Sequence, residues 1–321
     1  MSTQIELLKK YSLPVRGVSG QHLLIDPNIQ RKIVDLLELK PKDRVLEIGP
    51  GLGALTGEIL RRGKAKVWAI EKDARFVEVL EREFASHLGR DLNVIHGDIL
   101  KWDLEKFIRH PEGPFARHSE PRRGEESLRP FASLRVTGRV GGLRMTRTFK
   151  VISNIPYYIT APILFHLFSF HSRISLAVLT MQKEVAARLL ASPGSKDYGR
   201  LTLAVRYHAD VEHAFDISPG CFTPRPEVDS SVVILHFHPP SQLPRGVSED
   251  FFFRLIQTAF SQRRKTLLHL LSKNGPVKIS RGDLTALFSK LGLPITVRGE
   301  ELLLKDYLAL ASGLTPFAVA C

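Results

Sequence analysis

The segment Asn154-Ile155-Pro156-Tyr157 combines an amide, a stiff proline and an aromatic ring directly after the apolar run 151–153. Such a set could serve methyl transfer to the exocyclic amine of adenine. This amine is a poor nucleophile, because its lone pair is delocalised into the ring, and it needs help to react. The side-chain oxygen of Asn154 and the backbone carbonyl of Ile155 could accept its two hydrogens and aim the lone pair at a methyl donor. Pro156 would stiffen the turn, and Tyr157 could stack on the base. An ordinary Asn-x-Pro turn is the alternative.

A glycine-rich segment, EIGPGLG at 47–53, follows the apolar run 44–48 and precedes an apolar-periodic stretch at 54–60. Glycines there let the backbone approach a ligand closely, and the next helix offers unpaired N–H groups at its N-terminus. The dinucleotide fingerprint G-x-G-x-x-G is not met, because its sixth position is Ala54. A tight structural turn is the alternative.

Acidic residues close three predicted strands, with Glu47, Glu71 and Asp98 at or near their carboxyl ends. A carboxylate at Glu71 could accept two hydrogen bonds from ribose hydroxyls, and one at Asp98 could accept from an adenine amino group. Three acids in register indicate a nucleoside-binding crevice at the top of a parallel sheet. Solvated acids at strand ends are the alternative.

The elements that must position these residues alternate between strands and helices. We predict strands at 44–48, 66–71, 92–98, 149–153, 175–180 and 231–237, and helices at 26–39, 54–60, 74–87, 161–170 and 183–190. This alternation predicts an α/β fold with a doubly wound, Rossmann-like sheet. Prolines between 239 and 244 indicate a linker, and the pattern then becomes wholly helical at 251–271, 281–291 and 302–312. We therefore expect a first domain over 1–238 and a smaller all-α domain over 247–321.

One segment, 110–148, lacks apolar periodicity, and its Lys and Arg residues are eight arginines and no lysine. Its composition supplies no core, so we favour a disordered insertion. An ordered loop that grips RNA is the alternative.

Basic residues outnumber acidic ones by 46 to 33 among 321 residues, and the resulting net charge of +13 favours a polyanionic partner. Nucleic acid, an anionic membrane surface and a solvated basic surface all fit this charge. The chain shows neither a secretory signal nor an apolar run of membrane-spanning length, so we expect a cytoplasmic protein without a membrane partner. Two distant cysteines, Cys221 and Cys321, predict neither a disulfide framework nor a metal site.

Taken together, the motifs resemble those of the small-subunit ribosomal RNA adenine N6,N6-dimethyltransferases (the KsgA type). The shared segments, in family order, are GQHLL at 20–24, the turn at 47–53, NIPY at 154–157, QKEV at 182–185, YGRL at 198–201 and FTPRPEVDS at 222–230. The resemblance implies a class I methyltransferase fold, S-adenosylmethionine as donor and a role in small-subunit biogenesis. Its implied substrate is two adjacent adenines in a hairpin loop near the 3′ end of small-subunit (16S) RNA, each methylated twice. The pre-ribosomal small subunit is then the expected partner of a monomeric enzyme.

The resemblance also implies residue roles. Donor contacts fall on His22, Leu24, Gly49, Glu71, Asp98 and Asn154. Asn154 would be catalytic, and an exposed Phe222 would sandwich a flipped adenine against Tyr157. Basic residues in the helical tail would hold phosphates, namely Arg263, Arg264 and Lys265.

Two other functions fit part of the sequence. A large-subunit ribosomal RNA adenine methylase of the antibiotic-resistance type would share the donor site and Asn154, but the segment 222–230 and the long helical tail argue against it. A ribosome-assembly protein without catalysis is the other alternative, and intact Glu71, Asp98 and Asn154 argue against that loss.

Overall fold

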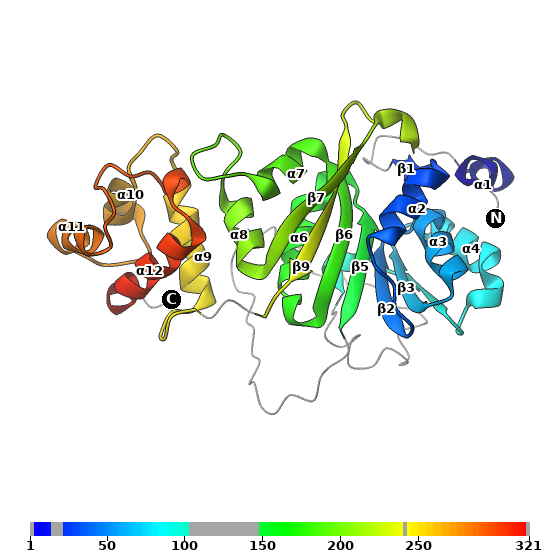
Figure 1. Ribbon diagram of the computed structural model, residues 1–321, viewed down its shortest axis with the longest axis horizontal. Coiled ribbons are helices and arrows are strands. Elements are labelled where there is room, and N and C mark those ends of the chain that lie inside the picture. The colour runs from blue at the N-terminus through cyan, green and yellow to red at the C-terminus, as the bar shows by residue number, and fades with distance from the viewer. Residues whose placement is uncertain (1–2, 14–21, 103–147, 240–242, 319–321) are drawn as a thin grey trace. The chain divides into compact units, whose positions relative to one another are not determined.

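The computed structural model describes residues 3–13, 22–102, 148–239 and 243–318 (Figure 1). The chain divides into two compact units, of which the first holds 1–186 and 209–239 and the second holds 187–208 and 240–321. Most of the predicted insertion, 110–147, lies outside the described residues. In the described ranges, no helix is long and apolar enough to cross a membrane.

The first unit is built on a seven-stranded sheet within the described residues. Its spatial order is β4 (Leu92–His96), β3 (Ala65–Glu71), β2 (Asp43–Ile48), β5 (Phe149–Asn154), β6 (Ile174–Gln182), β9 (Ser230–Phe237) and β7 (Ala209–Ile217). The pairs from β4 to β6 are parallel, whereas β9 runs antiparallel to both β6 and β7. The predicted doubly wound α/β sheet is therefore confirmed. The edge strand β7 was not predicted.

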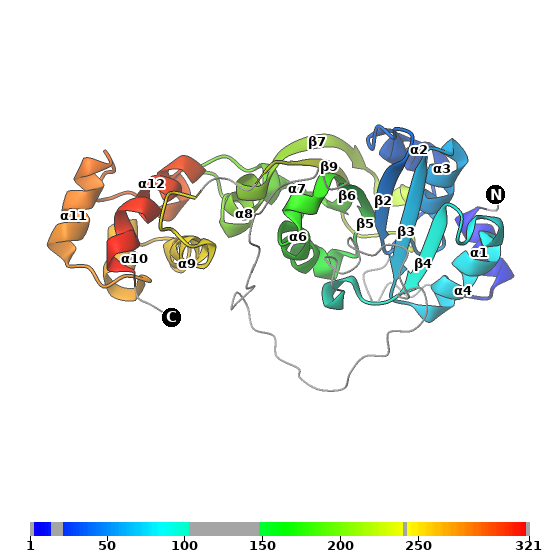
Figure 2. The same cartoon turned by 90° about the horizontal axis from the view of Figure 1, so that it is seen from below.

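Helices precede, connect and follow the parallel strands in the chain. They are α2 (Pro27–Asp35), α3 (Ala54–Arg62), α4 (Ala74–Glu83), α6 (Thr160–Phe168) and α7 (Lys183–Leu190). Figures 1 and 2 show α2 and α3 beside β2 and β3, and α6 beside β5 and β6. Asp26 begins α2 as predicted, because its carboxylate accepts the N–H groups of Asn28 and Ile29. The helix ends at Asp35, earlier than the expected residue 39.

A separate two-stranded ladder joins distant parts of the first unit. Strand β1 (Leu23–Leu24) pairs antiparallel with β8 (Phe222–Thr223), so Leu24 lies opposite Phe222. Both side chains are buried in the main core, which also contains apolar residues of β2, β3 and β9. This pairing brings the segments 22–24 and 222–230 to the same end of the sheet.

The second unit is helical. It contains α8 (Arg200–His208), α9 (Glu249–Ala259), α10 (Leu267–Asn274), α11 (Arg281–Lys290) and α12 (Leu304–Leu314). Residues 187–208 were expected in the first domain, but the side chains of Leu203 and Tyr207 on α8 share a core with Phe252 on α9. The Tyr198 hydroxyl also donates to the Leu302 carbonyl at 2.7 Å. The unit is thus assembled from two separate stretches of chain.

The single helix predicted over 251–271 is wrong, because the structure contains two helices there. Helix α9 ends at Ala259, and Thr266 begins α10 by accepting the N–H of His269 through its side chain. The basic residues at 263–265 therefore lie on the turn between the helices and not on a helix face.

Candidate functional site

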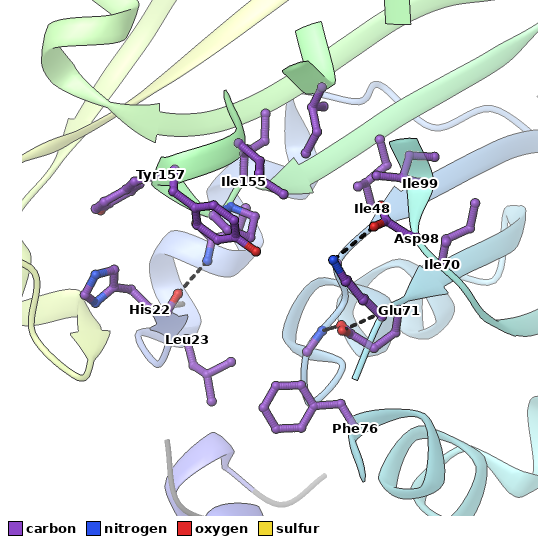
Figure 3. A pocket seen from close by; sticks show the side chains of 18 of the residues that line it. His22, Leu23, Ile48, Ile70, Glu71, Phe76, Asp98, Ile99, Ile155 and Tyr157 are labelled. Atoms are coloured by element: carbon purple, nitrogen blue, oxygen red, sulfur yellow. Dashed lines mark hydrogen bonds and ion pairs between the residues drawn. The ribbon is translucent and has the colours of Figure 1, made fainter. Parts of the chain in front are cut away.

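A pocket opens in the first unit where the strand order reverses between β2 and β5 (Figure 3). Such switch points are where open α/β sheets bind ligands, because the loops leaving the two strands diverge. The pocket is lined by His22, Leu23, Ile48, Gly49, Gly51, Ile70, Glu71, Lys72, Phe76, Gly97, Asp98, Ile99, Asn154, Ile155, Pro156, Tyr157, Tyr158, Ile159 and Ile163. Figure 3 shows His22 and Tyr157 on one side and Glu71 and Asp98 on the other. Three of the predicted motifs thus meet in one place.

The glycine turn at 49–53 forms the floor of the pocket before α3. Gly49 and Gly51 have φ of +65° and +58°, a region that residues with a Cβ rarely adopt. A Cβ on Gly51 would lie 2.9 Å from Leu23 Cδ2, whereas Gly49 has open space where a Cβ would stand. The turn therefore leaves room for a ligand against the backbone of Gly49, where the sequence predicts a donor contact.

Glu71 ends β3 and lies at the pocket wall with 4% of its surface exposed. Its carboxylate accepts the backbone N–H groups of Gly51, Lys72 and Asp73 at 3.0, 2.8 and 2.9 Å. Burial raises the pKa of the carboxyl group, and these three hydrogen bonds oppose the rise. Because a carboxylate has about four lone-pair sites, Oε2 retains capacity for a ligand hydroxyl.

The interpretation of three acids as one set is wrong for Glu47. This residue lies inside β2, is 1% exposed and does not line the pocket. Its carboxylate accepts a hydrogen bond of 2.5 Å from the Thr56 hydroxyl, below the first turn of α3. Burial raises the pKa of Glu47 to about 7, and the nearby charge of Glu71 adds to the rise. Glu47 therefore links β2 to the first turn of α3, the two elements that the glycine turn joins.

Asp98 follows β4 and reaches the pocket, as predicted. One carboxylate oxygen accepts the Leu100 N–H at 3.1 Å, and the other pairs with the Lys72 ammonium at 3.0 Å. The Lys72 side chain is 70% exposed, so an amino group that competes for Asp98 displaces a well-solvated partner at little cost. The carboxylate is thus accessible to an adenine amino group.

The Asn154 amide is held in one orientation. Its Nδ2 donates to the His22 carbonyl at 2.7 Å. Since a carbonyl only accepts, this contact assigns the nitrogen to His22 and turns the side-chain oxygen away from it. Asn154 and Ile155 both line the pocket. The acceptor oxygen that the sequence predicts is therefore oriented by a residue that lies 132 positions earlier in the chain.

Tyr157 follows Pro156 and is half-buried at the pocket wall. Its hydroxyl shares a hydrogen bond of 2.6 Å with Ser230 Oγ, and its ring centroid lies 5.1 Å from that of His22. The next residue, Tyr158, also lines the pocket and is 61% exposed. The Tyr157 ring is therefore fixed by its contacts, whereas the Tyr158 ring faces solvent.

The expected exposure of Phe222 is wrong, and the side chain of Leu24 does not reach the pocket. Phe222 was expected to be an exposed stacking residue, but it is 3% exposed and packs in the main core. The side chain of Leu24 is 2% exposed in the same core and does not line the pocket, and its expected donor contact stays a prediction. Consecutive residues of a strand face opposite sides, so Leu23 faces the pocket while Leu24 and its partner Phe222 face the core.

The predicted phosphate-binding residues belong to the second unit and differ from one another. Arg263 forms an ion pair with Glu300 and donates to the Ser195 carbonyl at 2.9 Å. Arg264 and Lys265 are exposed, and neither has an acidic partner in the described part of the chain. The last two are therefore better placed to hold a phosphate.

Several pocket residues were not predicted as site residues, among them Leu23, Lys72, Phe76 and Tyr158. Each of these four residues lies next to or a few positions after a predicted residue in the sequence. That closeness in sequence is the signal that could have identified them. Helix α1 (Gln4–Lys10) was also missed, and its Leu7 packs with Leu23 and Phe76. In the described ranges, no group of three or more His, Cys, Asp or Glu residues is arranged to hold a metal ion.

This chain is similar to known ribosomal RNA methyltransferases. A model of the family described as ribosomal RNA adenine dimethylase matches residues 15–297. Ribosomal RNA small subunit methyltransferase A of Halothermothrix orenii is 38% identical over 309 residues, which cover 96% of this chain and 91% of that protein. A dimethyladenosine transferase structure from Plasmodium falciparum is 27% identical with a TM-score of 0.67, covering 90% of this chain and 96% of that one. The structure of 23S rRNA methyltransferase ErmE, at 22% identity and a TM-score of 0.60 over 91% and 99% of the two chains, shows a shared fold alone. The chain belongs to the ribosomal RNA adenine dimethylase family.

Proposed function

We propose that this chain transfers methyl groups from S-adenosylmethionine to N6 of two adjacent adenines in small-subunit ribosomal RNA, twice on each. The adenines lie in a hairpin loop near the 3′ end of that RNA. The observation that carries the proposal is the fixed amide of Asn154, which lies in the same pocket as Glu71 and the glycine turn. Family membership supports the same reaction, and the similarity to ribosomal RNA small subunit methyltransferase A of Halothermothrix orenii supports the same ribosomal subunit.

The pocket fits the proposed donor. Open space above Gly49 admits a ligand against the backbone, and Glu71 keeps acceptor capacity for a ribose hydroxyl. Asp98 offers a carboxylate oxygen to an adenine amino group across the pocket. When bound, S-adenosylmethionine supplies an electrophilic methyl group on a sulfonium. The aromatic and apolar residues Phe76 and Leu23 cover the pocket beside Glu71 and shield it from water.

Asn154 and Ile155 orient the adenine amine that receives the methyl group. The Asn154 side-chain oxygen and the Ile155 carbonyl accept the two hydrogens of an adenine amine, which draws the lone pair out of the ring. Tyr157 stacks on the base and limits its motion, since a misplaced amine would not meet the methyl carbon in line. The sulfonium leaves as a neutral thioether, so the amine proton can be lost to solvent afterwards without a dedicated base.

RNA is held mainly by basic side chains. The net charge of +13 and the exposed Arg264 and Lys265 support contacts to phosphates, which carry affinity but no sequence information. We further propose that the enzyme acts as a monomer in the cytoplasm on the pre-ribosomal small subunit, without a metal ion and without membrane contact.

Transfer of tritium from labelled S-adenosylmethionine tests the function. We expect incorporation into unmethylated small subunits, little into large-subunit RNA, and N6,N6-dimethyladenosine after digestion to nucleosides. Incorporation into large-subunit RNA alone would favour the antibiotic-resistance type of methylase. Binding of small-subunit RNA with no incorporation into either RNA would favour an assembly protein without catalysis.

A further inference from the structure

Ser230 is the first residue of β9 and is fully buried. Its hydroxyl lies 2.6 Å from that of Tyr157, although 73 residues separate the two in sequence. The backbone of Ser230 pairs with Gln182 on one side and with Ile217 on the other. The position of the Ser230 hydroxyl is therefore fixed by strands on both sides.

The segment 222–230 also holds the other neighbour of the Tyr157 ring. The His22 ring, whose plane is tilted by 34° from that of Tyr157, hydrogen-bonds through Nδ1 to the Pro224 carbonyl at 2.7 Å. Because that carbonyl only accepts, Nδ1 carries the hydrogen. One segment thus fixes the ring of Tyr157 at its hydroxyl and also orients the imidazole beside it.

A ring that stacks on a substrate base must be held in one orientation to place that base accurately. A tyrosine side chain rotates about two torsions, and a half-buried ring retains some of this freedom. A hydrogen bond at the far end of the ring removes most of it. Burial raises the pKa of the Tyr157 hydroxyl, so the hydroxyl keeps its proton at neutral pH and the bond persists.

We propose that Ser230 is a positioning residue for methyl transfer, which acts by holding the Tyr157 ring through its hydroxyl. The proposal rests on the proposed function and assigns a task to the segment 222–230 other than stacking by Phe222. It explains how a segment whose aromatic residue is buried still serves the adenine pocket. Ser230 touches Tyr157 and not the reacting atoms.

The test compares Ser230→Ala with Ser231→Ala. Ser231 is the adjacent residue of the same strand and is equally buried, but its hydroxyl donates to Asp216 at 2.6 Å. We expect Ser230→Ala to lower the single-turnover transfer rate about fivefold to tenfold at saturating donor and RNA, the scale of one hydrogen bond. Donor affinity, measured by calorimetry, should stay at the parental value. Ser231→Ala should keep the parental rate.

A double-mutant cycle with Tyr157→Phe, which removes the hydroxyl and keeps Ser230, isolates the contact. We expect Tyr157→Phe to show the loss seen in Ser230→Ala, and the double variant to show no further loss. Equal rates in the two serine variants, or an undiminished effect of Ser230→Ala in the Tyr157→Phe background, would overturn the proposal. If Ser230→Ala does not fold, a parental rate in Tyr157→Phe overturns it. Absence of transfer by the parental enzyme would instead refute the proposed function.

Discussion

Replacing Glu71 by alanine should weaken donor binding and fold stability through two separable losses. Glu71 accepts three backbone N–H groups, of which the buried Gly51 N–H lacks easy access to water. Leaving that N–H without a partner costs about 1–3 kcal/mol of unfolding free energy. The variant also lacks the carboxylate oxygen that accepts a ribose hydroxyl of S-adenosylmethionine. This loss should weaken the binding free energy of the donor by about 1.5–3 kcal/mol, which raises its Kd about tenfold to 150-fold.

Asp73→Ala is the matched control. Asp73 is two residues away and carries the same charge, but it caps α4 by accepting the Arg75 N–H and does not line the pocket. Its loss should lower stability by about 1 kcal/mol and leave the Kd for the donor unchanged. Calorimetry with S-adenosylmethionine measures both affinities, and denaturant unfolding measures both stabilities.

The raised pKa of Glu71 adds a pH test. On acidification the carboxyl group should take up its proton above the ordinary value of 4.5, so donor affinity of the parental enzyme should fall as pH decreases. Glu71→Ala should lack this dependence. An unchanged Kd in Glu71→Ala, or equal losses of affinity in the Glu71 and Asp73 variants, would refute the assigned contact.

Glu47→Gln should stabilise the fold at pH 8 and keep the hydrogen bond from Thr56. The free-energy cost of burying the Glu47 charge is absent below the ordinary pKa of 4.5 and complete above about 7. Denaturant unfolding should therefore show a gain in unfolding free energy of up to about 3 kcal/mol at pH 8 and little gain at pH 4. A gain that is the same at both pH values would contradict this. Replacing Arg264 and Lys265 together by alanine should flatten the slope of log affinity for RNA against log salt by about 1.4–1.8, whereas Arg263→Ala should mainly lower the stability of the second unit. Equal slopes for the two variants would count against the assignment.

Features set by neighbours in sequence could be predicted from the sequence. The glycine turn, Glu71, Asp98 and Asn154 stand at or directly after apolar runs, so their place at the carboxyl ends of parallel strands follows from the pattern of β-α-β units. The same reasoning grouped Glu47 with them, although it lies one residue earlier than the end of β2 and faces the core.

Features set by distant pairing could not be predicted. Whether Leu23 or Leu24 faces the pocket depends on the register of a two-residue strand with Phe222, nearly 200 positions away. The ion pair between Arg263 and Glu300 likewise arises from packing of the second unit. The bond between Tyr157 and Ser230 is of the same kind, since no local pattern pairs the two hydroxyls.

The central claim is that the amide of Asn154, held by His22, orients the adenine amine. Single-turnover methyl transfer by Asn154→Ala at saturating S-adenosylmethionine, with RNA affinity measured separately, tests it most directly. Loss of a positioned polar group at a reacting centre costs about 10²–10³ in rate. The account predicts a loss of that size with an unchanged Kd for RNA, and a parental transfer rate in this variant would contradict it.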